Sequence, residues 1–416
     1  MPSRQTQKDL PLNPAKLRSH FPAFEEPSLR DWAFFENAGG AYPCRQVIDR
    51  LNDYYLTKKV QPYSPYPASS EAGQAMDLAY ARLAAALNVP VDAVHFGPST
   101  SANTYMLAHA LAGHIRPNSA IVVTNQDHEA NSGAWRRLAA EGHEIREWKV
   151  NSSTGRLDPD DLEELLDDKV AFVAFPHVSN IVGEINPANQ ICARLREAGI
   201  LSIVDGVAYA PHGLPDLGNL GADIYLFSAY KTYGPHLGVM MIRPELGRVL
   251  ANQGHYFNDR FLRKRLTIAG PDHAQIAAAA GIVDYLEAVA GLAADQTGDA
   301  TPFRRAHTAM RAQETMLMAP LLNYLTDRND IRLVGPAEPE SRAPTISVIA
   351  DRPGGEIAKG LAQHGIMASG GHFYAVRLME AMGIDPDHGV LRLSFLHYTE
   401  PEEIERLIAA LEVELA

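Results

Sequence analysis

The stretch Ile224-Tyr225-Leu226-Phe227-Ser228-Ala229-Tyr230-Lys231 indicates how this chain folds. Its apolar run, Ile224–Ser228, is continuous rather than alternating, which is typical of a strand that is covered on both faces. Similar runs lie at residues 119–124, 170–175, 201–204 and 237–242, and helix-length amphipathic segments lie at residues 74–87, 102–112, 131–141, 159–166 and 187–198. Strands that alternate with helices generally pair in parallel. The sequence therefore predicts an α/β fold, with a mainly parallel sheet between helices.

The last third of the chain has a different pattern. Two long helical segments, 274–290 and 304–325, precede a mixture of short strands and helices that continues to the end of the chain. This pattern predicts a smaller C-terminal α+β domain. We expect a large α/β domain over residues 31–300, a small domain over residues 301–416, and an N-terminal segment, residues 1–30, that packs on the small domain.

Composition excludes several classes of protein. The 37 Lys and Arg against 50 Asp and Glu leave a formal net charge of −13, which disfavours nucleic acids and anionic membrane surfaces as partners. Cys44 and Cys192 are too few for a disulfide framework or a four-cysteine zinc site, so we expect no metal centre. The N-terminus lacks the apolar core of a signal peptide, and no stretch approaches the ~18 apolar residues that span a bilayer. We therefore expect a soluble cytoplasmic protein.

Two charged residues stand at the ends of successive predicted strands. Lys231 follows the strand at Ile224–Ser228, and a partly desolvated lysine amine can lose its proton and attack a carbonyl. Asp205 closes the run at residues 201–204, where a buried carboxylate needs a positive partner such as a pyridinium nitrogen. Taken singly, Lys231 reads as a solvated loop lysine and Asp205 as a helix cap. Together they can hold opposite ends of one planar ligand.

Further polar residues lie at other strand ends and helix starts. Thr100 and Ser101 open a predicted helix, whose N-terminus can bind a phosphate. An imidazole at His128 can stack on an aromatic ring, and Asn180 can hydrogen-bond a phenolic oxygen. Each residue singly has a structural alternative, as a cap, a core histidine or a turn. Jointly they supply what pyridoxal 5′-phosphate requires, and the sequence motifs of P-loop, Rossmann and zinc-protease sites are missing.

Five short stretches carry a family resemblance: Phe34-Phe35-Glu36-Asn37-Ala38-Gly39-Gly40, Asp127-His128-Glu129-Ala130-Asn131, His177-Val178-Ser179-Asn180, Val204-Asp205-Gly206 and Ser228-Ala229-Tyr230-Lys231. The sequence resembles the fold type I pyridoxal-phosphate enzymes of the class V aminotransferase and cysteine desulfurase-like group. The resemblance implies the PLP-dependent transferase fold, with a mainly parallel seven-stranded sheet, and a homodimer whose active sites lie at the subunit interface.

The resemblance also implies a role for each residue. Lys231 would form the Schiff base with the cofactor, Asp205 would pair with the ring nitrogen, His128 would stack on the ring and Asn180 would contact its phenolic oxygen. Thr100, Ser101 and Ser228 would hold the phosphate, and Tyr230 would stand where many relatives have a histidine. Arg392 would bind the α-carboxylate of a small amino acid, with Asn37, His372 and Tyr374 completing the substrate site.

Two departures from the family pattern bear on function. The loop that carries the catalytic cysteine of the desulfurases reads Gly371-His372-Phe373-Tyr374-Ala375 here, and a phenol cannot accept sulfur as a persulfide. The Gly-Thr with which a partner subunit reaches the phosphate is replaced by Ala269-Gly270. Ordinary desulfurase turnover is therefore not expected. Because transamination needs only Lys231 as a proton shuttle, we expect a class V aminotransferase. The alternatives are a C–S or C–C lyase or β-eliminating enzyme, and after these an amino-acid racemase or epimerase or a non-catalytic module with the same fold.

Overall fold

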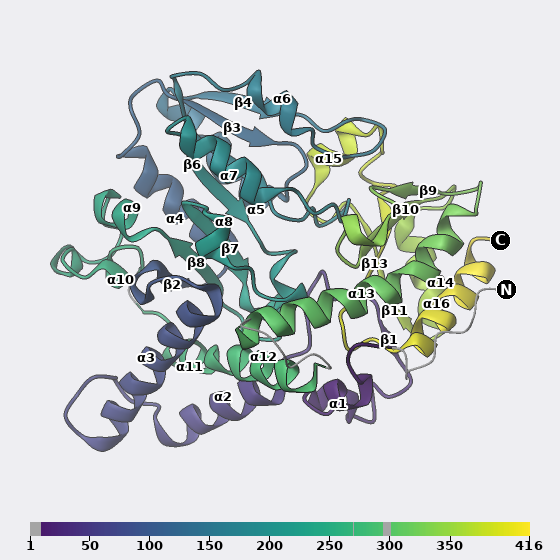
Figure 1. Cartoon of the computed structure of the whole chain (residues 1–416), viewed down its shortest axis with the longest axis horizontal. Helices are drawn as coiled ribbons and strands as arrows, with labels where there is room; N and C mark the ends of the chain where they lie inside the picture. Colours follow the sequence, from purple (N-terminus) through teal and green to yellow (C-terminus); the bar gives the residue numbers. More distant parts are fainter. Residues whose placement is uncertain (1–9, 269, 294–300) are drawn as a thin grey trace.

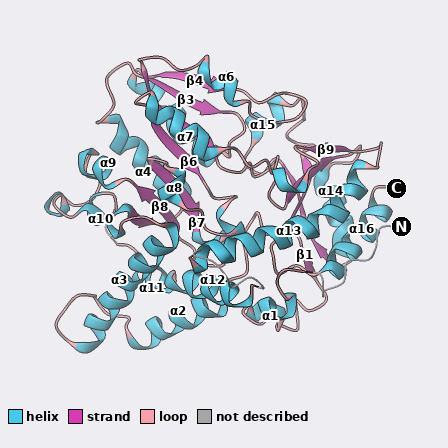
Figure 2. Ribbon diagram, in the orientation of Figure 1, coloured by secondary structure: helices cyan, strands magenta, loops and turns pink. Residues whose placement is uncertain are grey.

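The computed structural model describes residues 10–268, 270–293 and 301–416. Its strands and helices are labelled in Figure 1 and coloured by type in Figure 2. The strands are β1 (Ala33–Phe34), β2 (Val94–Gly97), β3 (Ala120–Thr124), β4 (Glu144–Trp148), β5 (Val170–Pro176), β6 (Leu201–Asp205), β7 (Ile224–Ser228), β8 (Gly238–Ile242), β9 (Arg332–Val334), β10 (Thr345–Ile349), β11 (Ile366–Met367), β12 (Ser369–Gly371) and β13 (Val390–Ser394). The helices are α1 (Pro14–Arg18), α2 (Arg45–Thr57), α3 (Pro67–Leu87), α4 (Thr100–Ala112), α5 (Glu129–Arg136), α6 (Pro159–Glu163), α7 (Ala188–Glu197), α8 (Leu217–Leu220), α9 (Pro244–Val249), α10 (Leu262–Arg265), α11 (His273–Ala278), α12 (Ala280–Leu292), α13 (Pro302–Thr326), α14 (Gly354–Gln363), α15 (Val376–Ala381) and α16 (Pro401–Glu414).

A seven-stranded sheet with the order β2-β8-β7-β6-β5-β3-β4 forms the centre of the larger part of the molecule. The pairs β3–β4, β3–β5, β5–β6 and β6–β7 are parallel, whereas β8 runs antiparallel to both β7 and β2. The predicted α/β fold with a mainly parallel seven-stranded sheet is therefore confirmed.

Alternate residues of the central strands pack into different apolar clusters, because successive side chains of a strand point to opposite faces. Ile121 and Val123 of β3 pack with Leu107 of α4 and Trp135 of α5. Val122 belongs to the cluster that contains residues of α3, α7 and α12. Because helices cover both faces of the sheet, polar side chains of the strands can contact a ligand only at the strand ends.

The sequence pattern predicts neither β2 nor β4. β4 is an edge strand that carries Glu144, Arg146 and Glu147, so it lacks the continuous apolar run of the inner strands. β2 has only four residues and contains His95, which is fully buried. The charged residues of the edge strand β4 and the buried histidine of β2 interrupt the apolar run from which a strand is predicted.

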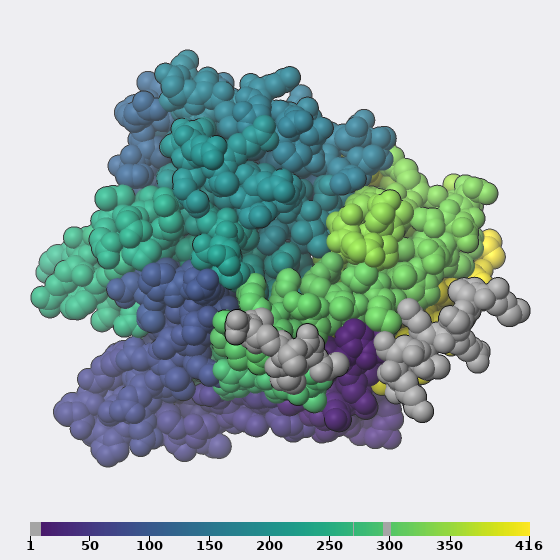
Figure 3. Space-filling view, viewed as in Figure 1, coloured from purple at the N-terminus to yellow at the C-terminus, as the bar shows by residue number. Residues whose placement is uncertain are grey.

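A second sheet, with the antiparallel order β12-β13-β10-β9, belongs to the C-terminal part. Leu317 and Leu321 of α13 pack beneath it, whereas Ala306 and Met310 of the same helix belong to a cluster of the large sheet. α13 therefore connects the two parts, and its green atoms lie between the teal sheet region and the yellow-green C-terminal region in Figure 3. The boundary that we expected at residue 300 adjoins residues 294–300, which lie outside the described residues.

The N-terminal segment contacts both parts of the molecule rather than the small domain alone. Phe21 packs edge-on against Tyr233 and Tyr285 of the larger part. Arg18 forms an ion pair with Glu400 at the start of α16, with 3.0 Å between Nη1 and Oε2. Residues 1–9 lie outside the described residues.

Residues His273–Leu292, which form α11 and α12, are long and apolar enough to cross a membrane by length and composition, although we expected no such stretch. Of the most apolar window in this segment, 67% is buried inside the fold. This degree of burial is typical of core helices in a folded domain. In Figure 1, α11 and α12 lie below the large sheet.

Arg342 connects the two parts through buried hydrogen bonds. Its side chain is fully buried and donates to the carbonyl oxygens of Val182 at 3.1 Å, Thr345 at 2.7 Å and Pro336 at 2.5 Å. Val182 follows β5, and Thr345 begins β10. One guanidinium thus satisfies backbone acceptors from both sheets.

We expect Arg342→Met to lower the free energy of unfolding by about 3 kcal/mol, because several buried carbonyl oxygens lose their donor. Urea unfolding followed by circular dichroism measures the change. The matched control is Arg352→Met, which removes a partly exposed arginine paired with Glu414 and should cost less than about 0.5 kcal/mol. Equal effects of the two substitutions would contradict the structural role of Arg342.

Candidate active site

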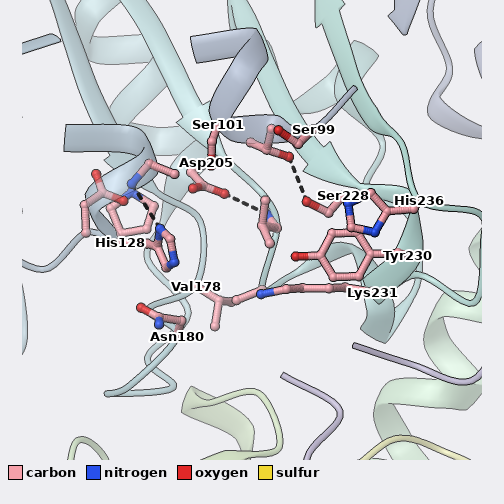
Figure 4. Close-up of a pocket in the computed structure, with 16 residues that line it drawn as sticks. Ser99, Ser101, His128, Val178, Asn180, Asp205, Ser228, Tyr230, Lys231 and His236 are labelled. Carbon is pink, nitrogen blue, oxygen red and sulfur yellow. Dashed lines mark hydrogen bonds between the residues drawn. The ribbon is translucent and has the colours of Figure 1, made fainter. Parts of the chain in front are cut away.

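One pocket brings together the residues that the sequence predicts around a cofactor. It opens at the carboxyl ends of β5, β6 and β7, where ligands of parallel sheets bind. Figure 4 shows it with the amine of Lys231 reaching across from the end of β7. The predicted residues that line it are Thr100, Ser101, His128, Asn180, Asp205, Ser228, Tyr230 and Lys231.

Lys231 and Asp205 have strongly perturbed acidities. Burial, together with the nearby positive charge of Arg392, lowers the pKa of Lys231 to about 8. Burial raises the pKa of Asp205 to about 6, although the N–H of Val207 donates to its Oδ1 at 2.8 Å and opposes that rise. The opposite charges of Lys231 and Asp205 stabilise each other. An amine that is easily deprotonated therefore shares the pocket with a carboxylate.

Hydroxyl groups at the start of α4 form the polar end of the pocket. The Oγ1 atom of Thr100 and the Oγ atom of Ser228 are 2.8 Å apart and hydrogen-bonded. Ser99 caps α4, because its Oγ accepts the N–H of Ala102 at 3.1 Å. A helix N-terminus with adjacent hydroxyls has the donors and the partial positive charge that bind a phosphate.

His128 forms a neutral wall of the pocket. It caps α5, with Nδ1 accepting the N–H of Ala130 at 3.0 Å, so Nε2 carries the proton. Burial, followed by the charge of Lys231, lowers the pKa of His128 to about 4. We expected a helix over residues 131–141, but α5 begins at Glu129 because of this cap and gives way to a 3₁₀ helix at Arg137.

The loop at residues 371–375 lies against His128 and Asn180, two residues that line the pocket. Phe373 and Tyr374 have left-handed backbones, with φ of 48° and 61°. The carbonyl oxygen of Phe373 accepts from Nδ2 of Asn180 at 3.0 Å, and that of Tyr374 accepts from the N–H of Glu129 at 2.8 Å. The Tyr374 ring lies 5.2 Å from the His128 ring but is 68% exposed, and the Nδ1 atom of His372 accepts the N–H of Tyr374. Tyr374 thus lies beside a wall of the pocket, although neither His372 nor Tyr374 is among the residues that line it.

The other two predicted substrate residues, Arg392 and Asn37, are likewise not among the residues that line the pocket. Arg392 is buried, and its Nη2 lies 2.6 Å from Oε1 of Glu36. Asn37 lies in a small neighbouring cavity that Lys231 also lines. The Asn37 amide already accepts from the hydroxyl of Tyr398 and donates to the carbonyl of Ser394 at 3.4 Å. These bonds give Asn37 a structural task, which is to hold its segment against β13.

Three residues of the site were not singled out from the sequence. Asp127 and His236 line the pocket, and Glu36 contacts Arg392. Burial and the charge of Asp205 raise the pKa of Asp127 well above its usual value. The sequence offered a signal for two of them, because Asp127 adjoins His128 and Glu36 adjoins Asn37, and both neighbours were predicted site residues. Within the described residues no group of three or more His, Cys, Asp or Glu side chains is placed to hold a metal ion.

The donor set fits pyridoxal phosphate. The pocket offers an amine, a carboxylate and a hydroxyl-lined helix start, which match its aldehyde, ring nitrogen and phosphate. The Oδ1 atoms of Asn180 and Asp127 are buried and have no hydrogen-bond partner within the described part of the chain. Buried polar atoms without partners are rare in folded proteins, and a polar ligand would satisfy them.

We expect the amine of Lys231 in cofactor-free protein to react with acetic anhydride with a midpoint near pH 8. Burial disfavours the protonated form, so the reactive neutral amine dominates at lower pH than for a solvated lysine. Mass spectrometry of the Lys231 peptide across a pH series measures the midpoint. In the urea-unfolded control the midpoint for Lys231 should return to about pH 10.5. A midpoint near that value in the folded protein would contradict the burial of Lys231.

Comparison with known proteins identifies relatives over nearly the whole chain. The family model of class V aminotransferases matches residues 33–407. The chain is 33% identical to the aminotransferase-like protein FGM3 of Gibberella zeae, covering 96% of this chain and 98% of that protein. It is 28% identical to the cysteine desulfurase-like protein ustD of Aspergillus flavus, covering 95% and 89%, and 28% identical to a probable cysteine desulfurase of Pseudomonas aeruginosa, covering 96% and 98%.

A solved structure supports the fold independently of close sequence similarity. The apo structure of a cysteine desulfurase from Thermococcus onnurineus NA1 matches with a TM-score of 0.84 and 22% identity, covering 97% of this chain and 98% of that one. The families with which this chain aligns are pyridoxal-phosphate-dependent, and their members act on amino acids. The chain therefore belongs to the class V aminotransferase family and is a pyridoxal-phosphate-dependent transferase or lyase of fold type I.

Proposed function

We propose that this protein is an aminotransferase that uses pyridoxal phosphate to act on a small α-amino acid. The observation that carries the proposal is the Lys231 amine, whose pKa burial lowers to about 8, in the same pocket as Asp205. Transamination requires one group that removes and returns the Cα proton, and a lysine of this acidity has the required properties at neutral pH. No cysteine lines this pocket.

Lys231, Arg392, Asp205 and His128 each have a defined task in this proposal. When bound, pyridoxal phosphate supplies an aldehyde that condenses with amines and a ring that takes up electrons. Lys231 moves the proton at Cα, while Arg392 binds the α-carboxylate and so orients the bond to be broken. Asp205 provides the negative charge at the inner end of the pocket, and the neutral ring of His128 excludes water from one wall.

A persulfide mechanism has little support in this chain. Burial raises the pKa of both Cys44 and Cys192 to about 12, so neither is a thiolate at neutral pH. The Sγ atom of Cys44 donates to the carbonyl of Gly281 in the core, and Cys192 lies in α7. Ordinary cysteine desulfuration is therefore disfavoured.

A lyase is the second candidate, and the loop at residues 371–375 favours it. His372 and Tyr374 lie on this loop, which contacts His128 and Asn180 and which, by the family resemblance, corresponds to the loop of the desulfurase cysteine. Either group can donate a proton to a leaving group. A C–S or C–C lyase would need this donor, whereas transamination would not.

We expect the loaded protein to convert its cofactor to the pyridoxamine form with at least one common amino acid, because Lys231 alone can complete the proton transfer. A spectroscopic screen, with keto-acid, ammonia and sulfide detection, measures this. A lyase would instead release product while the aldehyde form persists, and that outcome would contradict transamination.

Two variants serve as controls for this screen. Lys231→Ala should give no cofactor adduct after borohydride reduction, while its unfolding midpoint stays close to that of the unmodified chain. The double variant Cys44→Ala/Cys192→Ala should keep its rate within about twofold, because neither thiol reaches the pocket. Loss of activity in a folded double variant would restore a cysteine-dependent mechanism.

We also propose that the chain forms a homodimer through an exposed apolar surface. Two segments supply its large side chains: Tyr55, Leu56, Tyr63 and Tyr66, and Tyr256, Phe257, Phe261 and Ile268. The segments are adjacent, because Asp77 contacts both Tyr63, at 3.2 Å, and Arg263, at 3.3 Å. Exposed apolar surface of this extent favours association, and family members are often dimers.

Light scattering tests the dimer. We expect a mass about twice that of one chain, and a charged substitution at Tyr256 and Phe257 should shift it towards the monomer because it places charge in an apolar interface. The control substitution is Val413→Glu, an exposed apolar residue on α16 outside these segments. A mass of 45.4 kDa for the unmodified chain would contradict the proposal.

A further inference from the structure

The segment before α2 holds a carboxylate against Arg392. Residue Glu36 forms a parallel bridge with Ser394 of β13. On either side of it, the N–H of Phe35 donates to Met367 and the N–H of Asn37 donates to Ser394. The backbone of Glu36 is therefore fixed two residues from Arg392 along the strand, so their ion pair is built into the fold.

A glycine makes room for this carboxylate. A Cβ atom at Gly39 would lie 2.7 Å from Oε1 of Glu36, which is closer than side chains approach each other. The same Oε1 atom accepts from Nη2 of Arg392 at 2.6 Å. The backbone of residues 36–39 thus forms a turn that accommodates the Glu36 carboxylate at the guanidinium.

The ion pair leaves bonding capacity on both partners. The Oε2 atom of Glu36 and the Nε atom of Arg392 are buried and have no hydrogen-bond partner among the described residues. One face of the guanidinium is covered by the Phe373 ring, whose centroid lies 3.8 Å from Cζ. An arginine and a carboxylate bind each other more strongly through two parallel hydrogen bonds than through one, and Glu36 and Arg392 form only one.

Glu36 lies between Arg392 and the solvent. The side chain of Arg392 is 3% exposed, whereas that of Glu36 is 23% exposed. Phe373 covers one face of the guanidinium and Glu36 occupies Nη2, so an external carboxylate that binds in the guanidinium plane lies close to the Glu36 carboxylate. Two carboxylates at one partly buried guanidinium repel each other, since the interior screens charge less than water does.

We propose that Glu36 determines the affinity for the substrate carboxylate by occupying its position on Arg392. The incoming carboxylate must displace Oε1 of Glu36 or bind beside it at the free Nε edge. Glu36 therefore weakens binding and selects against anions that lack other contacts to the pocket. This inference rests on the proposed function only in that Arg392 is taken as the carboxylate site.

The test compares propionate binding to cofactor-loaded Glu36→Gln and unmodified protein by calorimetry. The Gln side chain keeps an acceptor for Nη2 but lacks the charge, so we expect the Kd for propionate to fall about tenfold. Glu287→Gln, which neutralises a surface partner of Arg82, is the matched control and should leave the Kd unchanged. An unchanged or higher Kd in Glu36→Gln would overturn the proposal.

A second variant identifies the site of binding. Arg392→Gln should abolish propionate binding both alone and in combination with Glu36→Gln, and persistent binding would overturn the proposal. The titrations are repeated on cofactor-free protein, and cofactor loading is read from absorbance. Failure to load the cofactor would contradict the proposed function but not this inference, whereas loaded protein with an unchanged propionate Kd would contradict this inference alone.

Discussion

Desolvation of an amine and a carboxylate in one pocket is the constraint on which the site depends. Helices cover both faces of the large sheet, so the ends of β6 and β7 deliver Asp205 and Lys231 into a space with little water. Burial moves their pKa values towards each other, to about 6 and about 8, while their opposite charges resist that movement. Such a pair is costly unless it serves a ligand, and for this reason perturbed groups concentrate at functional sites.

The residues that the sequence predicts around a cofactor line one pocket, and they were predictable because their signals are local. A continuous apolar run followed by a charged residue is enough to place Lys231 and Asp205 at a sheet edge. The substrate half was less predictable. The contact between Glu36 and Arg392 joins residues that are 356 positions apart, and the left-handed backbone at Phe373 and Tyr374 has no sequence signature in residues of this type. Edge strands such as β4 were missed for a related reason, since partial burial leaves no apolar run.

The two halves of the site come from different sheets and meet at Asn180. Its Nδ2 atom donates to the carbonyl of Phe373, and its own carbonyl accepts from Nη1 of Arg392 at 3.4 Å. Asn180 follows β5 of the large sheet, whereas Arg392 lies in β13 of the small one. The orientation of the two sheets therefore sets where Arg392 lies relative to the pocket, and the buried bonds of Arg342 to the segment after β5 and to β10 hold the two parts together.

The loop at residues 371–375 is held in place by the helix that His128 caps. A left-handed residue other than glycine costs about 1 kcal/mol, and this loop contains two in succession. The bond from the N–H of Glu129 to the carbonyl of Tyr374 offsets part of that cost, and Glu129 is the first residue of the helix that His128 caps. The position of Tyr374 and the position of the imidazole are therefore set by one helix terminus. Any movement of the loop away from the pocket must break this bond, so the position of the loop and the position of the His128 ring depend on each other.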